Sequence, residues 1–270
     1  MLLEDLKEEI PNAELPWLDK GKVDLSRLSL QNRMWRDFGY MFLRGFLPDN
    51  LIENYRRIRD PLQSPGGWGM GTPYMHFNEI KDICLYFPLM QILKELIGDD
   101  MGLHLNLTGY VSTERNWHQD TYLNEPCVKT WYLAVWMALE DIDPVSGPFE
   151  FIPGSHIWPC LSREKVKALL PIEERDTPHW PKHAEKILNS VFEEEIKRRV
   201  VKPVKFIAKK GDVLIWHSRL AHRGSEPLVP GTPRRALISH YSALSHRNDM
   251  PRRKQHYNGG WYFVHDTPLS

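Results

Sequence analysis

Three residues of the chain have side chains of the types that hold catalytic metal ions. His118 and Asp120 are separated by one residue, and His222 lies far downstream. Two imidazole nitrogens and one carboxylate oxygen occupy one face of a metal ion and leave the opposite face open, which is the donor set of non-haem Fe(II) centres that react with O2. The sequence therefore indicates oxidative metal chemistry, although it says little about the molecule that is oxidised.

The surroundings of these residues strengthen the prediction, because a His-x-Asp pair alone arises easily in a chain with 12 histidines. An extended apolar stretch precedes the pair, and a Pro-Gly-Ser-His turn follows within residues 147–156. A second apolar stretch ends at Trp216, shortly before the downstream histidine. Such an ordered series is much harder to obtain by chance than the pair itself.

On an extended strand, residues two apart point to the same face. We therefore expect one strand to carry both His118 and Asp120, with His222 supplied by a neighbouring strand or its end. His217 also follows the second apolar stretch and is the competing candidate for the third ligand. His156 belongs to the Pro-Gly-Ser-His turn and is interpreted as a residue of that turn or of the ligands' surroundings.

Apolar periodicity predicts a helical first part and a β-rich second part. Helices are expected over 29–38, 48–59 and, interrupted at Pro88, 77–97, with a short strand over 40–46. Strands are expected over 103–111, 130–139, 201–208, 213–216 and 235–241. A helical N-terminal flank of about residues 1–100 thus precedes the β core. A helical insertion of about residues 160–199 interrupts the core and is predicted to act as a lid, with a packed structural flank as the alternative.

Composition favours one domain of an ordinary intracellular enzyme. The chain has 270 residues, 41% of them hydrophobic, and 35 basic residues balance 35 acidic ones. This balance gives no charge to attract nucleic acid or a membrane surface. Cys84, Cys127 and Cys160 share no metal-type spacing and are expected to be reduced thiols. Since no signal-like segment or long apolar run is present, we expect a cytoplasmic protein whose oligomeric state is unknown.

The glycine cluster at residues 66–71 lacks the Lys-Ser/Thr that follows in phosphate-binding loops. We interpret it as a mobile loop.

Taken in order, the motifs resemble the phytanoyl-CoA dioxygenase (PhyH-like) family of Fe(II)/2-oxoglutarate-dependent oxygenases, from about Asp37 to Tyr241. The matching segments are Phe38–Phe46, His-x-Asp, Val135–Leu139, Pro-Gly-Ser-His, the Gly-Asp-Val-Leu of residues 211–214 and Arg234–Leu237. The resemblance implies a mainly β fold with flanking helices and a double-stranded β-helix (jelly roll, cupin-like) core in a single domain, residues 1–270. It also implies Fe(II), the cosubstrate 2-oxoglutarate and O2, with His118, Asp120 and His222 as the metal ligands.

The family binds the distal carboxylate of 2-oxoglutarate with a basic side chain, and arginine suits this task because its planar fork donates two hydrogen bonds. Arg234 and Arg235 are the candidates, and only one can point inward because neighbours on a strand face opposite ways. The resemblance favours Arg234, because it takes the position of the family's arginine before the Ala-Leu pair of residues 236 and 237. It also places Ser225 at the same carboxylate and Trp136 near the cosubstrate, with a plain core aromatic as the alternative for Trp136.

Asn106 and Thr108 alternate on the strand before the metal ligands and are expected to reach the cosubstrate or the substrate. The basic stretch of residues 247–254 is a candidate anion site, with a solvated surface as the alternative. Asp120 bears on the reaction, because related halogenases have a small residue in place of this carboxylate and so leave room for chloride.

The implied function is a dioxygenase that hydroxylates an aliphatic C–H bond of a small-molecule substrate and releases succinate and CO2. A metal-dependent hydrolase and a non-catalytic ligand-binding barrel, both using the same triad, are the alternatives.

Overall fold

The structure is a computed structural model that describes residues 1–62, 64, 67–68 and 72–265. Of the glycine cluster, only Gly67 and Trp68 belong to these residues, so the prediction of a mobile loop falls largely outside the described part of the chain. Among the described helices, none is both long and apolar enough to cross a membrane.

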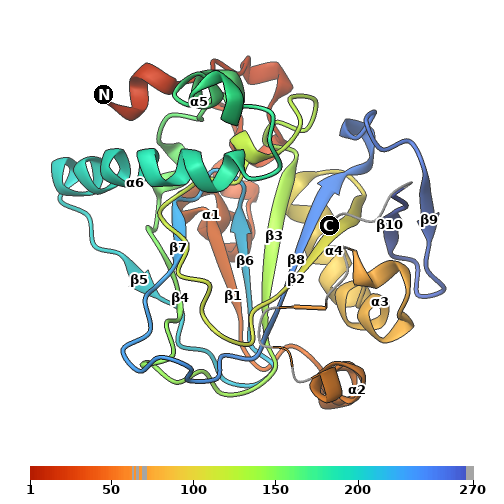
Figure 1. The fold of residues 1–270 in the computed structure, drawn as a ribbon. Coiled ribbons are helices and arrows are strands. Elements are labelled where there is room, and N and C mark those ends of the chain that lie inside the picture. The colour runs from red at the N-terminus through yellow and green to blue at the C-terminus, as the bar shows by residue number, and fades with distance from the viewer. Residues whose placement is uncertain (63, 65–66, 69–71, 266–270) are drawn as a thin grey trace.

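Two β-sheets form the centre of the molecule (Figure 1). The larger sheet has seven strands in the order β1-β6-β3-β8-β2-β10-β9, and the smaller sheet has three in the order β5-β4-β7. The strands are β1 Tyr40–Leu43, β2 Met101–Thr108, β3 Tyr132–Ala138, β4 Phe149–Phe151, β5 Val204–Lys205, β6 Val213–His217, β7 His222–Gly224, β8 Ala236–Ala243, β9 Arg253–Gln255 and β10 Trp261–Phe263. The two sheets and their flanking helices agree with the predicted mainly β class.

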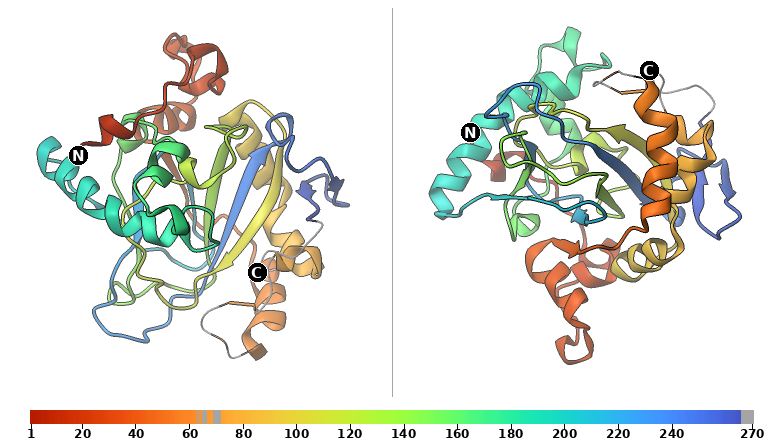
Figure 2. Two further views of the ribbon diagram at one scale, coloured as in Figure 1. Left: turned by 45° about the horizontal axis from the view of Figure 1, so that its top comes forward. Right: turned by 90° about the horizontal axis from the view of Figure 1, so that it is seen from below.

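Helices α1 to α4 pack against the outer face of the larger sheet (Figure 2). Their bounds are α1 Leu30–Phe38, α2 Asp49–Arg59, α3 Asn78–Cys84 and α4 Phe87–Ile97. Trp35, Ile52 and Leu93 of this layer share one buried cluster with Leu133 and Ile215 of the sheet. Burial of such side chains stabilises the fold by roughly 1.5–3 kcal/mol each.

Capping residues define the ends of these helices. The Ser29 hydroxyl accepts a hydrogen bond from the Asn32 N–H at 3.1 Å, and α1 ends at Gly39, whose φ of 73° is left-handed. Pro88 was expected to interrupt one long helix, but it lies in the first turn of α4. A proline is favourable there because the N–H that it lacks has no partner within the helix.

Aromatic side chains fill the space between the two sheets. Trp136 and Trp216 of the larger sheet share a buried cluster with Phe149 and Phe151 of the smaller one and with Phe206. The Phe149 and Trp216 ring centroids lie 4.8 Å apart. Apolar side chains therefore hold the two sheets together at this end.

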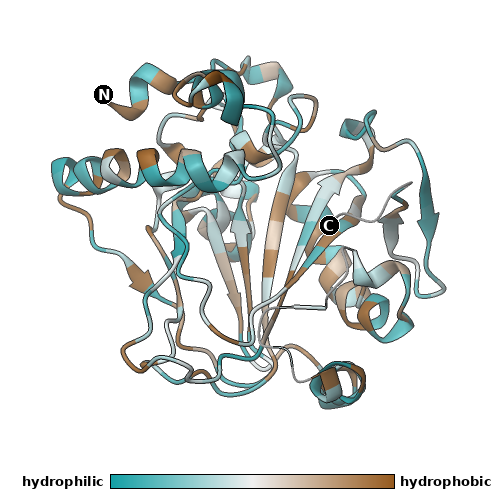
Figure 3. Ribbon diagram, viewed as in Figure 1, coloured by the Kyte–Doolittle hydropathy of each residue, from teal (hydrophilic) through white to brown (hydrophobic). Residues whose placement is uncertain are grey.

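The predicted helical insertion is present as α5 (Arg163–Ala168) and α6 (Trp180–Arg199). Hydrophobic and hydrophilic residues alternate along α6 (Figure 3), as expected for a helix with one buried stripe. Leu188 and Phe192 of α6 pack on Leu3, Leu6 and Trp117. The insertion thus joins the N-terminus to the segment that precedes the predicted metal ligands.

One strand prediction is confirmed and another needs correction. The short strand expected over 40–46 is present as β1, an edge strand of the larger sheet that pairs antiparallel with β6. Burial alternates along β1, with Met41 and Leu43 packed into the core, which gives the segment strand character. The strand expected over 201–208 shrinks to Val204–Lys205, since its partner β4 has only three residues and Pro203 has no N–H to donate.

The basic C-terminal stretch lies on and beside the β9–β10 hairpin, at the far edge of the larger sheet. Arg247 is buried and pairs with Asp249 at 2.9 Å. No described residue of this stretch lines the cavity at the predicted metal ligands.

Candidate metal centre and its cavity

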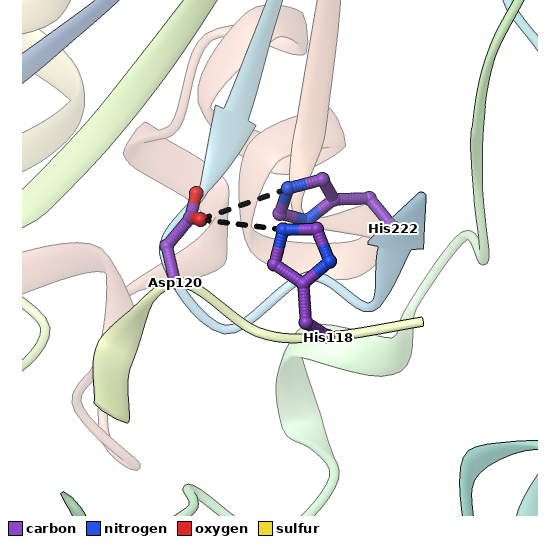
Figure 4. A group of neighbouring side chains, drawn as sticks. All are labelled: His118, Asp120 and His222. Atoms are coloured by element: carbon purple, nitrogen blue, oxygen red, sulfur yellow. Dashed lines mark ion pairs between the residues drawn. The ribbon is translucent and has the colours of Figure 1, made fainter. Parts of the chain in front are cut away.

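The structure brings His118, Asp120 and His222 together (Figure 4). All three are buried, and their ligand atoms lie within 4.8 Å of one another. Asp120 Oδ1 is 3.8 Å from His118 Nε2 and 3.7 Å from His222 Nε2. Two donors that each contact one ion at about 2 Å can be up to about 4 Å apart, so these separations suit a shared metal ion.

Backbone hydrogen bonds join the two segments that carry the candidate ligands, residues 118–121 and 218–222. His118 and His222 form an antiparallel bridge, in which each N–H donates to the carbonyl of the other at 3.1 and 3.0 Å. The Asp120 N–H donates to the Ser218 carbonyl at 2.8 Å.

The expectation that one extended strand carries His118 and Asp120 is therefore wrong. His118 forms only the isolated bridge, and Asp120 has helical backbone angles at the start of a short 3-10 helix. The chain turns at Asp120 because its N–H and that of Thr121 share the Ser218 carbonyl. The ligand atoms meet through this turn and not through strand alternation.

Surrounding hydrogen bonds orient each ligand. Nδ1 of His118 lies 2.8 Å from the Asn116 carbonyl, and Nδ1 of His222 lies 2.9 Å from the Leu220 carbonyl. Because a carbonyl only accepts, each ring carries its proton on Nδ1 and turns the Nε2 lone pair toward the common centre. His118 Nε2 is buried without any hydrogen-bond partner among the described residues. A metal ion would satisfy this atom, so the site fits one.

The Asp120 carboxylate is held in the same manner. Trp216 Nε1 donates to Asp120 Oδ2 at 3.0 Å and leaves Oδ1 facing the two imidazoles. Burial lowers the pKa of His118 well below its ordinary value and also lowers that of His222. Neutral imidazoles are the form that binds metal ions.

The other two candidate histidines face elsewhere. His217 Nε2 lies 2.9 Å from Asp19 Oδ2, and its Nδ1 accepts the Arg219 N–H. His156 is buried against Gly39, and its Nε2 lies 2.9 Å from the Arg36 carbonyl. Both histidines therefore tie the N-terminal part of the chain to the jelly roll.

A cavity of about 610 Å³ opens onto the triad. Arg234 lines it and is almost fully buried. Its Nη1 donates to the Gly147 carbonyl at 2.7 Å, and no described carboxylate lies within ion-pair distance. Burial lowers the pKa of Arg234 to about 10. A buried guanidinium without a counter-ion is costly, so this side chain is suited to an anion that enters the cavity.

Arg235 points the other way. Its Nη1 lies 2.5 Å from Glu140 Oε2, and its own N–H donates to Glu140 Oε1 at 2.9 Å. Glu140 therefore neutralises Arg235 outside the cavity.

Trp136 lines the cavity, and its Nε1 is buried without a hydrogen-bond partner among the described residues. Ser225 is buried, but its hydroxyl donates to the Pro148 carbonyl at 2.6 Å, and it is absent from the described cavity lining. The structure thus brings Trp136 to the cavity beside Arg234 and keeps Ser225 behind the wall.

Asn106 and Thr108 line the cavity, yet their side chains contact the helical layer. Asn106 Nδ2 lies 3.3 Å from Cys84 of α3, and Thr108 Oγ1 lies 3.4 Å from the Tyr55 hydroxyl of α2. A register irregularity between Leu103 and Leu105 shifts the alternation of β2. Their contact with cosubstrate or substrate stays a prediction.

No described residue of the 160–199 insertion lines the cavity, so its role as a lid also stays a prediction. Instead, Glu185 of α6 forms a two-point ion pair with Arg115, whose Nε lies 3.2 Å from Glu185 Oε2. Arg115 does line the cavity.

Sequence reasoning missed three cavity residues: Arg115, Trp216 as the partner of Asp120, and His240. Arg115 stands only three residues before His118 in the sequence, and this closeness could have indicated that it lies near the metal ligands. His240 lies on β8 six residues after Arg234, a spacing that puts both on one face of an extended segment.

Comparisons with known proteins agree with this geometry. Residues 106–236 match the family described as phytanoyl-CoA dioxygenase (PhyH). Among curated proteins, none matches the chain in a sequence comparison.

Solved structures share the fold at low identity. EctD from S. alaskensis with bound Fe is 18% identical, with 86% of this chain and 83% of that chain covered and a TM-score of 0.63. The non-heme alpha-ketoglutarate-dependent epimerase SnoN of nogalamycin biosynthesis is 16% identical, with coverages of 78% and 81% and a TM-score of 0.57. The carbocyclase SnoK from the same biosynthesis is 18% identical, with coverages of 83% and 87% and a TM-score of 0.56.

These likenesses confirm the jelly-roll core with flanking helices. The family match covers the segment that holds the triad and Arg234. The resemblance to the PhyH-like family of Fe(II)/2-oxoglutarate-dependent oxygenases is therefore confirmed by the family match over residues 106–236.

Proposed function

We propose that the protein hydroxylates an aliphatic C–H bond of a small-molecule substrate, with His118, Asp120 and His222 as ligands of Fe(II) and Arg234 as the residue that binds 2-oxoglutarate. The observation that carries the proposal is one cavity with two unsatisfied features: the convergent ligand atoms of the triad and a buried arginine without a described counter-ion. A dicarboxylate that binds both would satisfy each of them.

The residues that line the cavity have separate roles in this proposal. The triad occupies one face of the metal and leaves the other face toward the cavity. Arg234 binds the distal carboxylate and fixes the orientation of the cosubstrate. When bound, Fe(II) with 2-oxoglutarate and O2 supplies the oxidant, while 2-oxoglutarate becomes succinate and CO2. The aromatic wall of Trp136, Phe149 and Trp216 excludes water from this space.

Hydroxylation is favoured over halogenation because the Asp120 carboxylate occupies the place that chloride would need. Nothing in the triad alone separates hydroxylation from other oxidations, and the printed descriptions of SnoN and SnoK name an epimerase and a carbocyclase. A hydrolase or a binding barrel would use the triad. Neither would give a role to Arg234, which is buried without a described carboxylate partner.

The test is an anaerobic titration of the metal-free protein with Fe(II) and then with 2-oxoglutarate. We expect the weak visible charge-transfer band that arises when a 2-oxo acid chelates Fe(II). In Arg234→Ala, 2-oxoglutarate should bind about tenfold to hundredfold more weakly, because a charge-assisted bidentate contact is lost. Arg235→Ala is the matched control and should leave the titration unchanged.

Fe(II) binding without the band would refute the oxygenase proposal and favour the hydrolase. Equal titrations for Arg234→Ala and the wild type would refute the role of Arg234. After these tests, release of succinate in the presence of candidate compounds identifies substrates, and analysis of the products distinguishes hydroxylation from other oxidations.

A further inference from the structure

One polar residue on the cavity wall has no place in the proposed function so far. His240 is 6% exposed and lines the cavity. Its Nε2 is buried without a hydrogen-bond partner among the described residues. A buried nitrogen that lacks a partner is unfavourable, so a ligand that satisfies it gains in affinity.

Strand register places His240 beside the metal centre. His240 of β8 stands opposite Ala134 of β3, which in turn stands opposite Trp216 of β6. The His240 and Trp216 ring centroids lie 6.1 Å apart, and Trp216 donates to Asp120. Ala134 is small and leaves space between the two rings. His240 thus faces the cavity in the row of side chains that supports the metal ligands.

Arg234 lies at the opposite end of this wall. The rows between them contain Ile238 and Trp136, which pair with each other in the register. Six residues of extended chain span roughly 20 Å. A cosubstrate that reaches from the metal to Arg234 therefore extends away from His240, and the space at His240 is left for another molecule.

The hydrogen bond of His240 to Tyr132 fixes its proton. Nδ1 of His240 meets the Tyr132 hydroxyl in a short, buried hydrogen bond. Burial raises the pKa of Tyr132 well above its ordinary value and lowers that of His240 to about 4, so both groups are neutral. The side chain of Asn124 is a second partner of this hydroxyl and acts to lower the pKa of Tyr132, as a donor does. The hydroxyl therefore accepts from Asn124 and donates to Nδ1. The imidazole proton then lies on Nε2, which makes Nε2 a hydrogen-bond donor.

The charges around the cavity are already balanced. Arg115 forms an ion pair with Glu185, and Arg223 Nε lies 2.7 Å from Glu150 Oε2. Asp120 belongs to the metal site, and Arg234 is committed to the cosubstrate. Among the described residues, no unpaired charge is left to recognise a charged substrate. The remaining wall is largely apolar, with Leu105, Leu107, Phe149, Trp216 and Ile238.

We infer that His240 is a substrate-binding residue, whose Nε2–H donates to an oxygen acceptor of a neutral, largely apolar substrate and so holds a neighbouring C–H bond near the metal. This inference rests on the proposed function, because it assumes that Fe(II) and 2-oxoglutarate occupy the rest of the cavity. The substrate class is a ketone, lactone, ether or alcohol with a mainly hydrocarbon skeleton.

The test measures binding to the full-length protein loaded with Fe(II) and 2-oxoglutarate without O2. The probes are camphor and cyclooctanone, each paired with its hydrocarbon (bornane, cyclooctane), and the anion camphorsulfonate. Ligand-observed NMR gives the affinities. In the wild type, at least one ketone should bind about fivefold more tightly than its hydrocarbon, the value of one neutral hydrogen bond. The anion should bind most weakly.

His240→Phe should abolish the preference for the ketone without changing the 2-oxoglutarate titration. His240→Gln keeps an amide donor near the position of Nε2 and should keep part of the preference. Tyr132→Phe should reduce the preference, since the tautomer is no longer fixed. His246→Phe is the matched control and should behave as the wild type, because His246 stacks on Trp131 outside the cavity.

Three results would overturn the inference. The wild type binds no ketone in preference to its hydrocarbon, or it prefers the anion, or His240→Phe weakens 2-oxoglutarate binding tenfold and so places His240 in the cosubstrate site. Failure of the proposed function is recognised separately, since the wild type would then give no charge-transfer band before any probe is added.

Discussion

The cavity has two walls that are built in different ways. On one wall, β3, β6 and β8 present side chains in a regular antiparallel register, which runs from Ala138 opposite Ala236 to Tyr132 opposite Ser242. On the other wall, His118 and Asp120 lie on an irregular segment next to His222, the first residue of the three-residue strand β7. A reciprocal bridge between His118 and His222 and the hydrogen bonds to the Ser218 carbonyl hold this segment in place.

This difference shows what fixes the positions of the side chains in each wall. In the regular wall, the position of a residue follows from its place in the strand. In the irregular wall, the position of a residue follows from individual hydrogen bonds, such as those that the imidazoles donate to the Asn116 and Leu220 carbonyls. We therefore expect most substitutions in the irregular wall to act on the metal and most in the regular wall to act on bound organic molecules. Trp216 of β6 is the exception, because it donates to Asp120.

The largest effect should come from Asp120→Ala. Loss of one of three protein ligands should weaken Fe(II) binding by more than about a hundredfold, since loss of a ligand's supporting contact alone costs tenfold to hundredfold. Oxidation should be abolished. Anaerobic competition with a chelator measures the Fe(II) affinity, with Asp141→Ala as a control because Asp141 pairs with Lys209 at the surface. Full oxidative activity in Asp120→Ala would contradict the assigned centre.

Replacement of two tryptophans of the regular wall tests the contact by which Trp216 also supports the proposed metal ligand Asp120. Trp216→Phe keeps most of the ring but removes the hydrogen bond to Asp120 Oδ2, so Fe(II) should bind about tenfold more weakly. Trp136→Phe also loses an indole N–H, but that group has no described partner, so the Fe(II) affinity should be unchanged. The same chelator competition measures both. Equal effects would mean that Trp216 acts through packing alone.

The contrast between the walls also explains what could be predicted from the sequence. The strands β3, β6 and β8 were located closely, because short runs of mainly apolar residues mark both their extent and their burial. That Arg234 and Arg235 face opposite sides followed from strand alternation, and the structure shows Arg234 inside.

The irregular wall could not be predicted in the same way. His118 and Asp120 were found by residue type, but the turn that aims them depends on the distant Ser218 carbonyl. The register shift in β2 and the pairing of Arg115 with Glu185 likewise depend on contacts between segments far apart in the chain. No local pattern of residues encodes such contacts.

A smaller effect is expected where the insertion supports the irregular wall. Glu185→Gln removes the carboxylate that holds Arg115. Glu185 is buried while Arg115 is partly exposed, so the unpaired charge should cost about 1–2 kcal/mol of unfolding free energy. Urea denaturation measures this loss, with Glu193→Gln on an exposed turn of the same helix as the control. Unchanged stability in Glu185→Gln would show that α6 is held by its apolar face alone.

The smallest effect should come from Thr108→Val, which tests the register of β2, the strand that pairs with β8 of the regular wall. In the structure, the Thr108 hydroxyl lies 3.4 Å from that of Tyr55, on the helical side of β2. Since a bond of this length contributes little, the affinity for 2-oxoglutarate should stay within about twofold of the wild-type value, as measured by the anaerobic titration. A tenfold loss would mean that this hydroxyl contacts the cosubstrate, as strand alternation alone predicts, and that β2 shifts its register when the cavity is filled. The position of β2 beside the regular wall would then depend on the bound molecule as well as on strand pairing.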